Sequence, residues 1–212
     1  MRLDVYVITD AALARGRSAE QVVTAAIRGG ADAIQYREKQ ASAREMVEVG
    51  RALRQITREA GVLFIVNDRV DVALAVDADG VHVGQDDIPA DIVRRLLGPD
   101  KIVGVSAATP EEARRAKADG ADYLGVGAIY ATSSKADAGA ATGPALLTQL
   151  KQAVDLPIVA IGGVSIHNAA EAVRYGADGV AVISAVVGAP DIAQATAALK
   201  AVVEEAKRER GG

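Results

Sequence analysis

Cysteine is absent from the 212-residue sequence, which excludes disulfides, thiol nucleophiles and cysteine metal ligands. Aromatic residues make up only 3% of the chain, so Val, Ile, Leu and Ala must fill the hydrophobic core. Histidine occurs twice. His82 lies within an expected strand and is interpreted as a hydrogen-bonded interior residue, whereas His167 begins an expected helix and is expected to face solvent. The sequence therefore offers little general-base machinery.

Long runs of one charge and long apolar runs are also missing. The net charge is −4, and no cluster of Lys or Arg is long enough for a nucleic-acid surface. Any bound anion must therefore be small and held by a few placed cations. No apolar run approaches the length of a membrane span, and no signal-peptide pattern precedes the first strand. We expect a soluble, cytoplasmic protein with neither nucleic acid nor membrane as a partner. The sequence leaves the oligomeric state open and allows a homo-oligomer.

Short β-branched runs alternate with longer helical patterns along the whole chain, which is typical of βαβ units around a parallel sheet. The expected strands are residues 3–9, 33–39, 62–67, 80–83, 102–106, 123–127, 157–161 and 179–183. The expected helices are residues 18–28, 43–59, 70–76, 90–97, 110–118, 145–154, 167–175 and 191–207. No linker or change in composition divides them, so we predict one domain over residues 1–212.

A short motif recurs where a helix passes into the next strand. Its four copies are Gly30-Ala-Asp-Ala-Ile, Asp77-Ala-Asp-Gly-Val, Gly120-Ala-Asp-Tyr-Leu and Gly176-Ala-Asp-Gly-Val. Small residues with turn chemistry suit a repeated junction between helix and strand. Together with eight strand–helix pairs, the motif favours an α/β fold of the closed (β/α)8 type, the TIM barrel, over an open sheet.

Acidic and amide residues follow the third and fourth expected strands. Asn67 ends the third and Asp68 follows it, and Asp86 and Asp87 come after the fourth. The carboxyl ends of barrel strands meet at one face. In proteins, Mg2+ is usually bound by one or two carboxylates, and water and substrate phosphate complete its coordination shell. We therefore predict a Mg2+ site at Asp68 and one of the two later aspartates. The alternative is that Asp68 caps the helix that follows.

Positive side chains follow the second expected strand. The strand period of two sends Gln35, Arg37 and Lys39 to one face. Two cations lie beside two acidic strand ends. This combination indicates a bound polyphosphate, whose negative charge the cations would balance, and a bound metal, which the carboxylates would hold. The alternative is that Arg37 and Lys39 pair structurally with Glu38 or with other acids of the barrel.

Hydroxyl groups and glycines follow the later strands. Ser106 ends the fifth strand and could donate to a ligand or cap a helix, but no His–acid arrangement supports it as a nucleophile. Residues 132–135 place three hydroxyls before a lysine, which suits either a phosphate or a hydrophilic loop. Gly162-Gly163 and Ile183-Ser184 end the last two strands, where backbone N–H groups bind phosphate in many barrels.

These segments, in this order, resemble the thiamine phosphate synthase family. The resemblance covers nearly the whole chain, through Gln-Tyr-Arg-Glu-Lys at 35–39, Val-Asn-Asp-Arg at 66–69, Gly-Val-His-Val-Gly-Gln-Asp-Asp at 80–87, Gly-Val-Ser at 104–106, Thr-Ser-Ser-Lys at 132–135, Ala-Ile-Gly-Gly at 160–163 and Val-Ile-Ser at 182–184. It implies an enzyme that joins an aminopyrimidine methyl diphosphate to a thiazole ethyl phosphate, or to its carboxylated form. The products would be thiamine phosphate and pyrophosphate, and the cofactor would be Mg2+.

The resemblance also implies a role for each matching position. The pyrimidine diphosphate would be held by Gln35, Arg37, Lys39, Asn67, Ser106 and Lys135, of which Arg37, Lys39, Ser106 and Lys135 would be catalytic. The thiazole phosphate would be held by Thr132, Ser134, Gly163, Ile183 and Ser184. Asp68 and Asp87 would hold Mg2+, which settles the choice against Asp86. Family members often have Pro, Thr and His where this chain has Ala131, Ser134 and Ala108.

Two alternatives use the same fold. One is a thiazole tautomerase or regulatory paralogue, which tends to lose the diphosphate and metal residues that this chain keeps. The other is a phosphosugar isomerase or epimerase, which needs a positioned acid/base pair that we cannot nominate from the sequence. Attack by the lone pair of a thiazole nitrogen needs no catalytic base, and its demand lies in stabilising the departing diphosphate.

Overall fold

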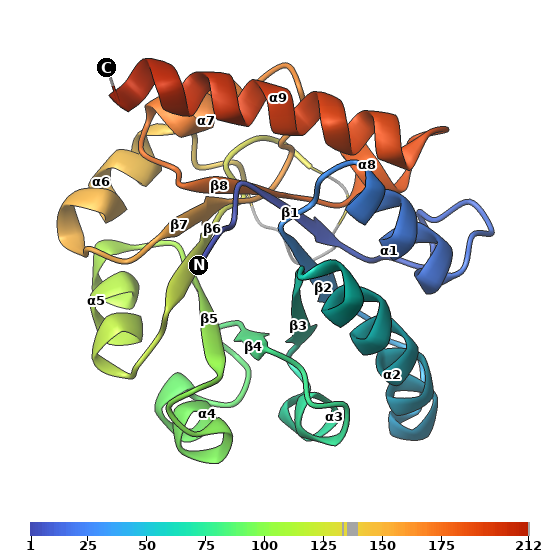
Figure 1. Ribbon diagram of the computed structural model, residues 1–212. Coiled ribbons are helices and arrows are strands. Elements are labelled where there is room, and N and C mark those ends of the chain that lie inside the picture. Colours follow the sequence, from blue (N-terminus) through green and yellow to red (C-terminus); the bar gives the residue numbers. More distant parts are fainter. Residues whose placement is uncertain (133, 135–139, 212) are drawn as a thin grey trace.

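The computed structural model describes residues 1–132, 134 and 140–211, and within them the parallel strands β1 to β8 close into a barrel (Figure 1). The strands are β1 (Val5–Ile8), β2 (Ala33–Tyr36), β3 (Leu63–Asn67), β4 (Gly80–Val83), β5 (Ile102–Ala107), β6 (Tyr123–Val126), β7 (Ile158–Ala160) and β8 (Gly179–Val182). Each strand pairs with its sequence neighbour, and β8 pairs with β1 to complete the ring. The predicted TIM barrel is confirmed.

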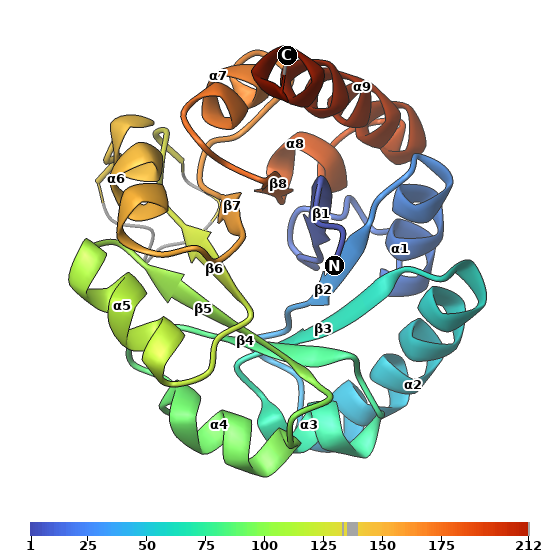
Figure 2. The same cartoon turned by 60° about the vertical axis from the view of Figure 1, so that its left-hand side comes forward.

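Helices surround the strands as an outer ring, and one short helix, Ser184–Val187, lies inside this ring beside β8 and β1 (Figure 2). In the described residues they are α1 (Ala19–Arg28), α2 (Ala43–Ala60), α3 (Val70–Ala75), α4 (Ala90–Leu97), α5 (Pro110–Ala118), α6 (Ala145–Ala153), α7 (Ala169–Arg174), α8 (Ser184–Val187) and α9 (Ile192–Gly211). Three differences from the sequence prediction matter below. The second strand ends at Tyr36 and not at Lys39, α7 begins after the exposed His167, and α8 was not predicted.

Helix starts follow from local sequence. Ser18 and Ser42 each accept a hydrogen bond from the backbone N–H three residues on, and a Gln or Glu side chain at that position returns one to the serine N–H. Thr109 caps α5, whose first residue is Pro110. These capping arrangements satisfy N–H groups that a helix start otherwise leaves without partners, so the helix starts are set by the chain itself.

Two hydrophobic cores are separated by the sheet. The larger core fills the space between the strands and the surrounding helices. The smaller core lies within the barrel and consists of Leu3, Tyr6, Ile8, Ala33, Ile65, Tyr123, Val159, Ala181 and Ile183. The interior is therefore packed, as in other TIM barrels, and a ligand can enter only at an end.

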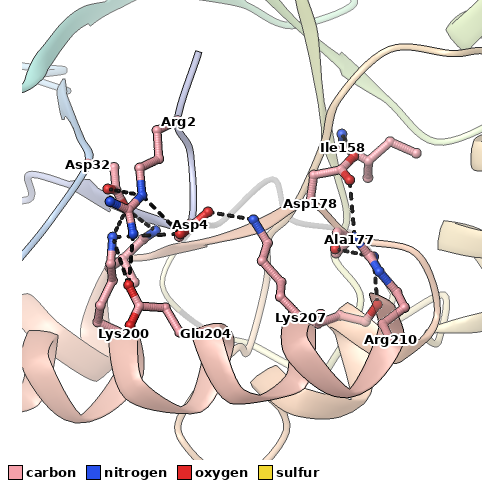
Figure 3. A network of polar contacts seen from close by, with 12 residues as sticks. Arg2, Asp4, Asp32, Ile158, Ala177, Asp178, Lys200, Glu204, Lys207 and Arg210 are labelled. Atoms are coloured by element: carbon pink, nitrogen blue, oxygen red, sulfur yellow. Dashed lines mark hydrogen bonds and ion pairs between the residues drawn. The ribbon is translucent and has the colours of Figure 1, made fainter. Parts of the chain in front are cut away.

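The aspartate of the repeated motif has the same role in all four copies. Its carboxylate accepts a hydrogen bond from the backbone N–H near the start of the preceding strand, at 2.8–3.0 Å, in the pairs Asp32–Val5, Asp79–Phe64, Asp122–Val103 and Asp178–Ile158. Each carboxylate also pairs with a cation, namely Lys200, Arg54, Arg94 and Lys151 respectively. Figure 3 shows the first and the last of these clusters along α9. The motif therefore ties neighbouring strands together at the amino end of the barrel.

No helix among the described residues is long and apolar enough to cross a membrane.

Candidate active site

A cavity of about 220 Å³ lies at the carboxyl ends of β5 to β8. All five residues expected to seat a phosphate line it, and Ser106 lines it as well; the five are Thr132, Ser134, Gly163, Ile183 and Ser184. The structure thus brings together residues from three separate loops, as the sequence predicted.

The short helix α8 forms one wall of this cavity. It begins at Ser184 directly after β8, with Ile183 as its N-cap, and the Ser184 hydroxyl lies 3.0 Å from that of Ser134. The first N–H groups of a helix lack intrahelical partners and carry partial positive charge, which suits an anion. Sequence analysis missed α8 because four residues are too few to display a 3.6-residue period.

Gly162 and Gly163 allow two loops to meet at this wall. Their φ angles are +90° and +65°. A Cβ atom on Gly163 would lie 2.4 Å from the carbonyl oxygen of Ala131, and one on Gly162 would lie 2.5 Å from Cα of Ala128. Only glycine fits both the backbone angle and the space, so the pair shapes the cavity as well as lining it.

Two carboxylates meet across the mouth of the barrel, at the ends of β3 and β4. Burial raises the pKa of Asp87, and the hydrogen bond and negative charge of Asp68 raise it further, against the lowering effects of the Gly84 N–H and of Lys39. The Gly84 N–H donates to Asp87 Oδ2 at 2.8 Å. Lys39 Nζ lies 2.7 Å from Asp68 Oδ2. Lys39 therefore pairs with Asp68 and only attracts Asp87, and the two carboxylates repel each other.

This pair fits Mg2+ in the number and type of its ligands. Among the described residues there is no group of three or more Asp, Glu, His or Cys side chains that could hold a metal. Mg2+ does not need one, because it keeps water and binds substrate phosphate beside one or two carboxylates. Asp86 is exposed. The capping alternative for Asp68 is wrong, since the N-cap of α3 is Arg69 and makes no side-chain cap bond.

Arg37 and Lys39 lie beyond the end of the strand that contains Gln35. Because β2 ends at Tyr36, the prediction that Gln35, Arg37 and Lys39 share one strand face is wrong beyond that residue. Gln35 is buried inside the barrel at 2% exposure. Arg37 Nη1 lies 3.2 Å from Asp10 Oδ2. Both cations thus pair with barrel acids, as the structural alternative expected.

Two further predicted residues complete the comparison. Asn67 is buried at the end of β3, beside the carboxylate pair in sequence. Lys135, predicted to be catalytic, lies outside the described residues.

Ser106 belongs to a hydrogen-bonded chain within the barrel. His82 Nε2 is 3.0 Å from Ser106 Oγ, and His82 Nδ1 is 3.0 Å from the Tyr123 hydroxyl. The Tyr123 hydroxyl is 2.9 Å from that of Tyr6, which accepts from Gln35 Nε2 at 3.0 Å. The prediction of a hydrogen-bonded interior histidine is confirmed. The second ring nitrogen of His82 faces a phenol, so these contacts form no Ser–His–acid triad.

Sequence analysis missed Tyr6 and Tyr123. Burial raises the pKa of both far above the ordinary value for tyrosine, so both remain neutral hydrogen-bonding groups. A signal existed in Gly104 and Gly125, which occupy strand positions where a side chain would collide with Tyr123 and His82. That signal becomes readable only once the strand register is known.

Comparisons with known proteins agree over nearly the whole chain. A family model described as thiamine monophosphate synthase matches residues 5–186. A thiamine-phosphate synthase of Moorella thermoacetica is 56% identical over 204 residues, which is 96% of this chain and 97% of that protein. One from Roseiflexus castenholzii is 60% identical over 195 residues, covering 92% of this chain and 86% of that protein. The solved structure of thiamine phosphate pyrophosphorylase from Pyrococcus furiosus matches with a TM-score of 0.88 and 46% identity, covering 96% of each chain.

Proposed function

The chain belongs to the thiamine monophosphate synthase family, and from that premise we propose how its residues condense the two substrates. The thiazole nitrogen forms a bond to the methylene carbon of the aminopyrimidine methyl diphosphate. The C–O bond to the diphosphate breaks, and its electron pair leaves with pyrophosphate. The products are thiamine phosphate and pyrophosphate. No proton is removed from the nucleophile, so the reaction does not require the described contacts of His82 with Ser106 and Tyr123 to act as a general base.

The observation that carries this proposal is the division of the barrel mouth into two parts. On the side of β5 to β8, a cavity whose described lining residues are uncharged offers hydroxyls and the start of α8, which suits a phosphate monoester. On the side of β2 to β4, Asp68 and Asp87 meet beside Lys39, which suits a metal and a diphosphate. Two anchored phosphate ends would hold the reacting atoms at near-attack distance, an effect worth up to roughly 7–11 kcal/mol.

Arg37 and Lys39 are assigned to the departing diphosphate. Each now contacts a carboxylate, at 3.2 Å and 2.7 Å respectively, so each would exchange that partner for a phosphate oxygen. Lys135 and the Ser106 hydroxyl are assigned to the same leaving group, Lys135 by the family resemblance. Preorganised positive charge at a developing negative charge lowers the barrier.

Asp68 and Asp87 are assigned to Mg2+, because their mutual repulsion leaves a place for a cation. Mg2+, when bound, would add positive charge against the diphosphate. Asn67, at the end of the same strand as Asp68, is assigned to the substrate diphosphate.

Gln35 is assigned to the pyrimidine ring. Its Oε1 atom is buried and has no hydrogen-bond partner among the described residues. An unpartnered buried acceptor costs about 1–3 kcal/mol, and the amino group of the pyrimidine would supply the missing donor. Gln35 lines a cavity of about 40 Å³ that shares four residues with the larger one, namely Ser106, Gly125, Ile161 and Ala181.

The test is an assay of the purified chain with both substrates, with Mg2+ and with EDTA. We expect thiamine phosphate and pyrophosphate in equal amounts, and no product in EDTA. A metal-independent reaction would overturn the assignment of Asp68 and Asp87. A thiazole tautomerase would form no new bond between the substrates, and a phosphosugar isomerase would use neither of them. Absence of thiamine phosphate would therefore favour one of these two alternatives.

A further inference from the structure

We propose that Tyr6, Tyr123 and His82 are positioning residues for the condensation. Together with Gln35 and Ser106 they form a single directed chain of hydrogen bonds, which we call the barrel relay. One end holds the Gln35 carbonyl oxygen ready for the pyrimidine amino group, and the other frees the Ser106 hydroxyl hydrogen for the diphosphate. This inference rests on the proposed function, and it adds three residues that touch neither the metal nor the phosphates.

The direction of the relay follows from its first hydrogen bond. Gln35 Nε2 can only donate, so the Tyr6 oxygen accepts. Within the described residues the Tyr6 hydroxyl has one other partner, the Tyr123 hydroxyl at 2.9 Å. The Tyr6 hydrogen therefore goes to Tyr123, because the reverse order would leave it buried without an acceptor.

With a neutral His82, the remaining steps follow in turn. Tyr123, having accepted from Tyr6, donates its hydrogen to His82 Nδ1. A neutral imidazole that accepts at one nitrogen donates at the other, so His82 Nε2 donates to Ser106 Oγ. Ser106 therefore keeps its own hydrogen, and Ser106 lines the large cavity. An anion there would meet a hydrogen-bond donor.

The strands make room for this relay. A Cβ atom at Gly104 would lie 2.2 Å from the Tyr123 ring, and one at Gly125 would lie 2.8 Å from the His82 ring. The two missing side chains let the Tyr123 and His82 rings lie across the neighbouring strands. Both tyrosines are 1% exposed, so the hydrogen bond between them is shielded from bulk solvent. The positions of the Tyr123 and His82 rings therefore depend on glycine at positions 104 and 125.

A reversed relay would present different chemistry at both ends. If Ser106 donated to His82, the hydrogens would run toward Gln35, and its amide would have to turn over to accept from Tyr6. The Gln35 NH2 group would then face the small cavity and would favour an oxo group on the pyrimidine. The direction that follows from the Gln35 amide orientation instead favours an amino group. The relay therefore couples two properties: the preference of Gln35 for an amino group over an oxo group on the pyrimidine, and the availability of the Ser106 hydroxyl as a donor to the diphosphate.

The decisive variant is Tyr6→Phe, which removes the hydroxyl that holds Gln35 and keeps the ring. The assay compares the 4-aminopyrimidine methyl diphosphate with its 4-oxo counterpart. We expect kcat/KM for the amino substrate, and the preference for it over the oxo substrate, each to fall at least about tenfold. KM for the thiazole phosphate should stay within about twofold, because Tyr6 does not line the larger cavity. Tyr175→Phe, at an exposed tyrosine outside the barrel, is the matched control and should change neither value.

Two variants of His82 test the other end. His82→Gln keeps an amide N–H that can reach Ser106, whereas His82→Leu keeps none. We expect kcat to fall about tenfold or more in His82→Leu and to recover in part in His82→Gln. Equal rates in these two variants would overturn the proposal, even if Tyr6→Phe did not fold.

The outcomes separate the relay from the reaction itself. If the unaltered chain forms no thiamine phosphate, the proposed function and the relay fail together. If it does, and Tyr6→Phe lowers the rate equally with both pyrimidines or not at all, only the relay fails. A lower preference for the amino substrate, with folding confirmed by circular dichroism, supports it.

Discussion

The carboxylates at the two ends of the barrel differ in their ion-pair partners. At the amino end, each aspartate of the repeated motif accepts a strand N–H and pairs with at least one cation, as Asp32 pairs with Lys200 and Arg2 (Figure 3). At the carboxyl end, Asp68 lies close enough to Asp87 to raise its pKa, and Lys39 pairs with Asp68. Among the described residues, each motif aspartate at the amino end is in an ion pair, whereas Asp87 at the carboxyl end is in none. Unbalanced charge of this kind is typical of a functional site.

The largest expected effect follows from removing one acid at the carboxyl end. Asp87→Ala should lower turnover by roughly 10²-fold or more, because a partner of the metal is lost. Lys135→Ala should have an effect of the same size. Steady-state assays at saturating Mg2+ measure both.

The matched control for Asp87 is its exposed neighbour, Asp86. Asp86→Ala should keep the rate within about twofold, since no hydrogen bond or ion pair ties it to the site among the described residues. Near-normal rates in both Asp87→Ala and Lys135→Ala would remove the site assignment and with it the contrast between the two ends.

The sequence predicted the fold because its signals are local and repeated. Strand and helix periods alternate through the chain, and four copies of one motif mark the amino end. Barrel topology then carries Asp68 and Asp87 to the same face without further information. The gathering of these residues, and of those around Ser184, was therefore predictable even though their roles remain predictions.

The parts that the sequence did not predict depend on partners distant along the chain. Arg37 pairs with Asp10 on another strand end, and no pattern within either segment specifies this. The contact of Tyr6 with Tyr123 joins residues 117 positions apart. The sequence prediction extended β2 three residues beyond its true end at Tyr36. It therefore treated loop residues as if they lay on one face of a strand. Register and tertiary pairing, not propensity, decide such contacts.

The second expected effect concerns stability at the amino end. Asp32→Ala removes a buried carboxylate and leaves Lys200 and the Val5 N–H without it, which should cost about 2–3 kcal/mol of unfolding free energy. Asp122 has the same role, but its side chain is 42% exposed against 9% for Asp32. Asp122→Ala should therefore cost only about 1 kcal/mol. Urea denaturation measures both, and kcat should not change in either variant. Loss of kcat without loss of stability would contradict the division of roles.

A smaller effect should appear in the pH dependence of stability. Burial raises the pKa of Asp4, but Lys207, Arg2 and Lys200 together lower it by more, so it lies below its usual value. Its stabilising contribution is present above the pKa of the unfolded chain, about 3.9, and is lost as the pH falls through the lower folded value.

We therefore expect Asp4→Asn to be less stable than the unaltered chain at pH 7, by about 1 kcal/mol. The difference should shrink as the pH falls below about 4. Thermal melts from pH 7 downward measure it, with Asp100→Asn, at an exposed residue, as the control. A difference that stays constant with pH would mean that the Asp4 charge contributes nothing.

The smallest effect has the opposite sign and lies at the carboxyl end. A raised pKa means that folding disfavours the ionised form of Asp87, so its contribution to stability falls as the pH rises through that pKa. Asp87→Asn removes the repulsion from Asp68 and keeps an oxygen for the Gly84 N–H. A like-charge contact this open to solvent is worth less than about 1 kcal/mol, which is at most about 2–4 °C in Tm for a chain of this size.

In EDTA at pH 7, Asp87→Asn should therefore melt slightly higher than the unaltered chain, although it is the less active protein. Saturating Mg2+ should cancel or reverse the difference, because only the unaltered chain gains stability from binding the metal. Asp86→Asn should melt like the unaltered chain in both conditions. If Asp87→Asn melted lower in EDTA, Lys39 alone would balance the two carboxylates. The carboxyl end would then resemble the amino end, and the strongest physical reason to place a metal there would be gone.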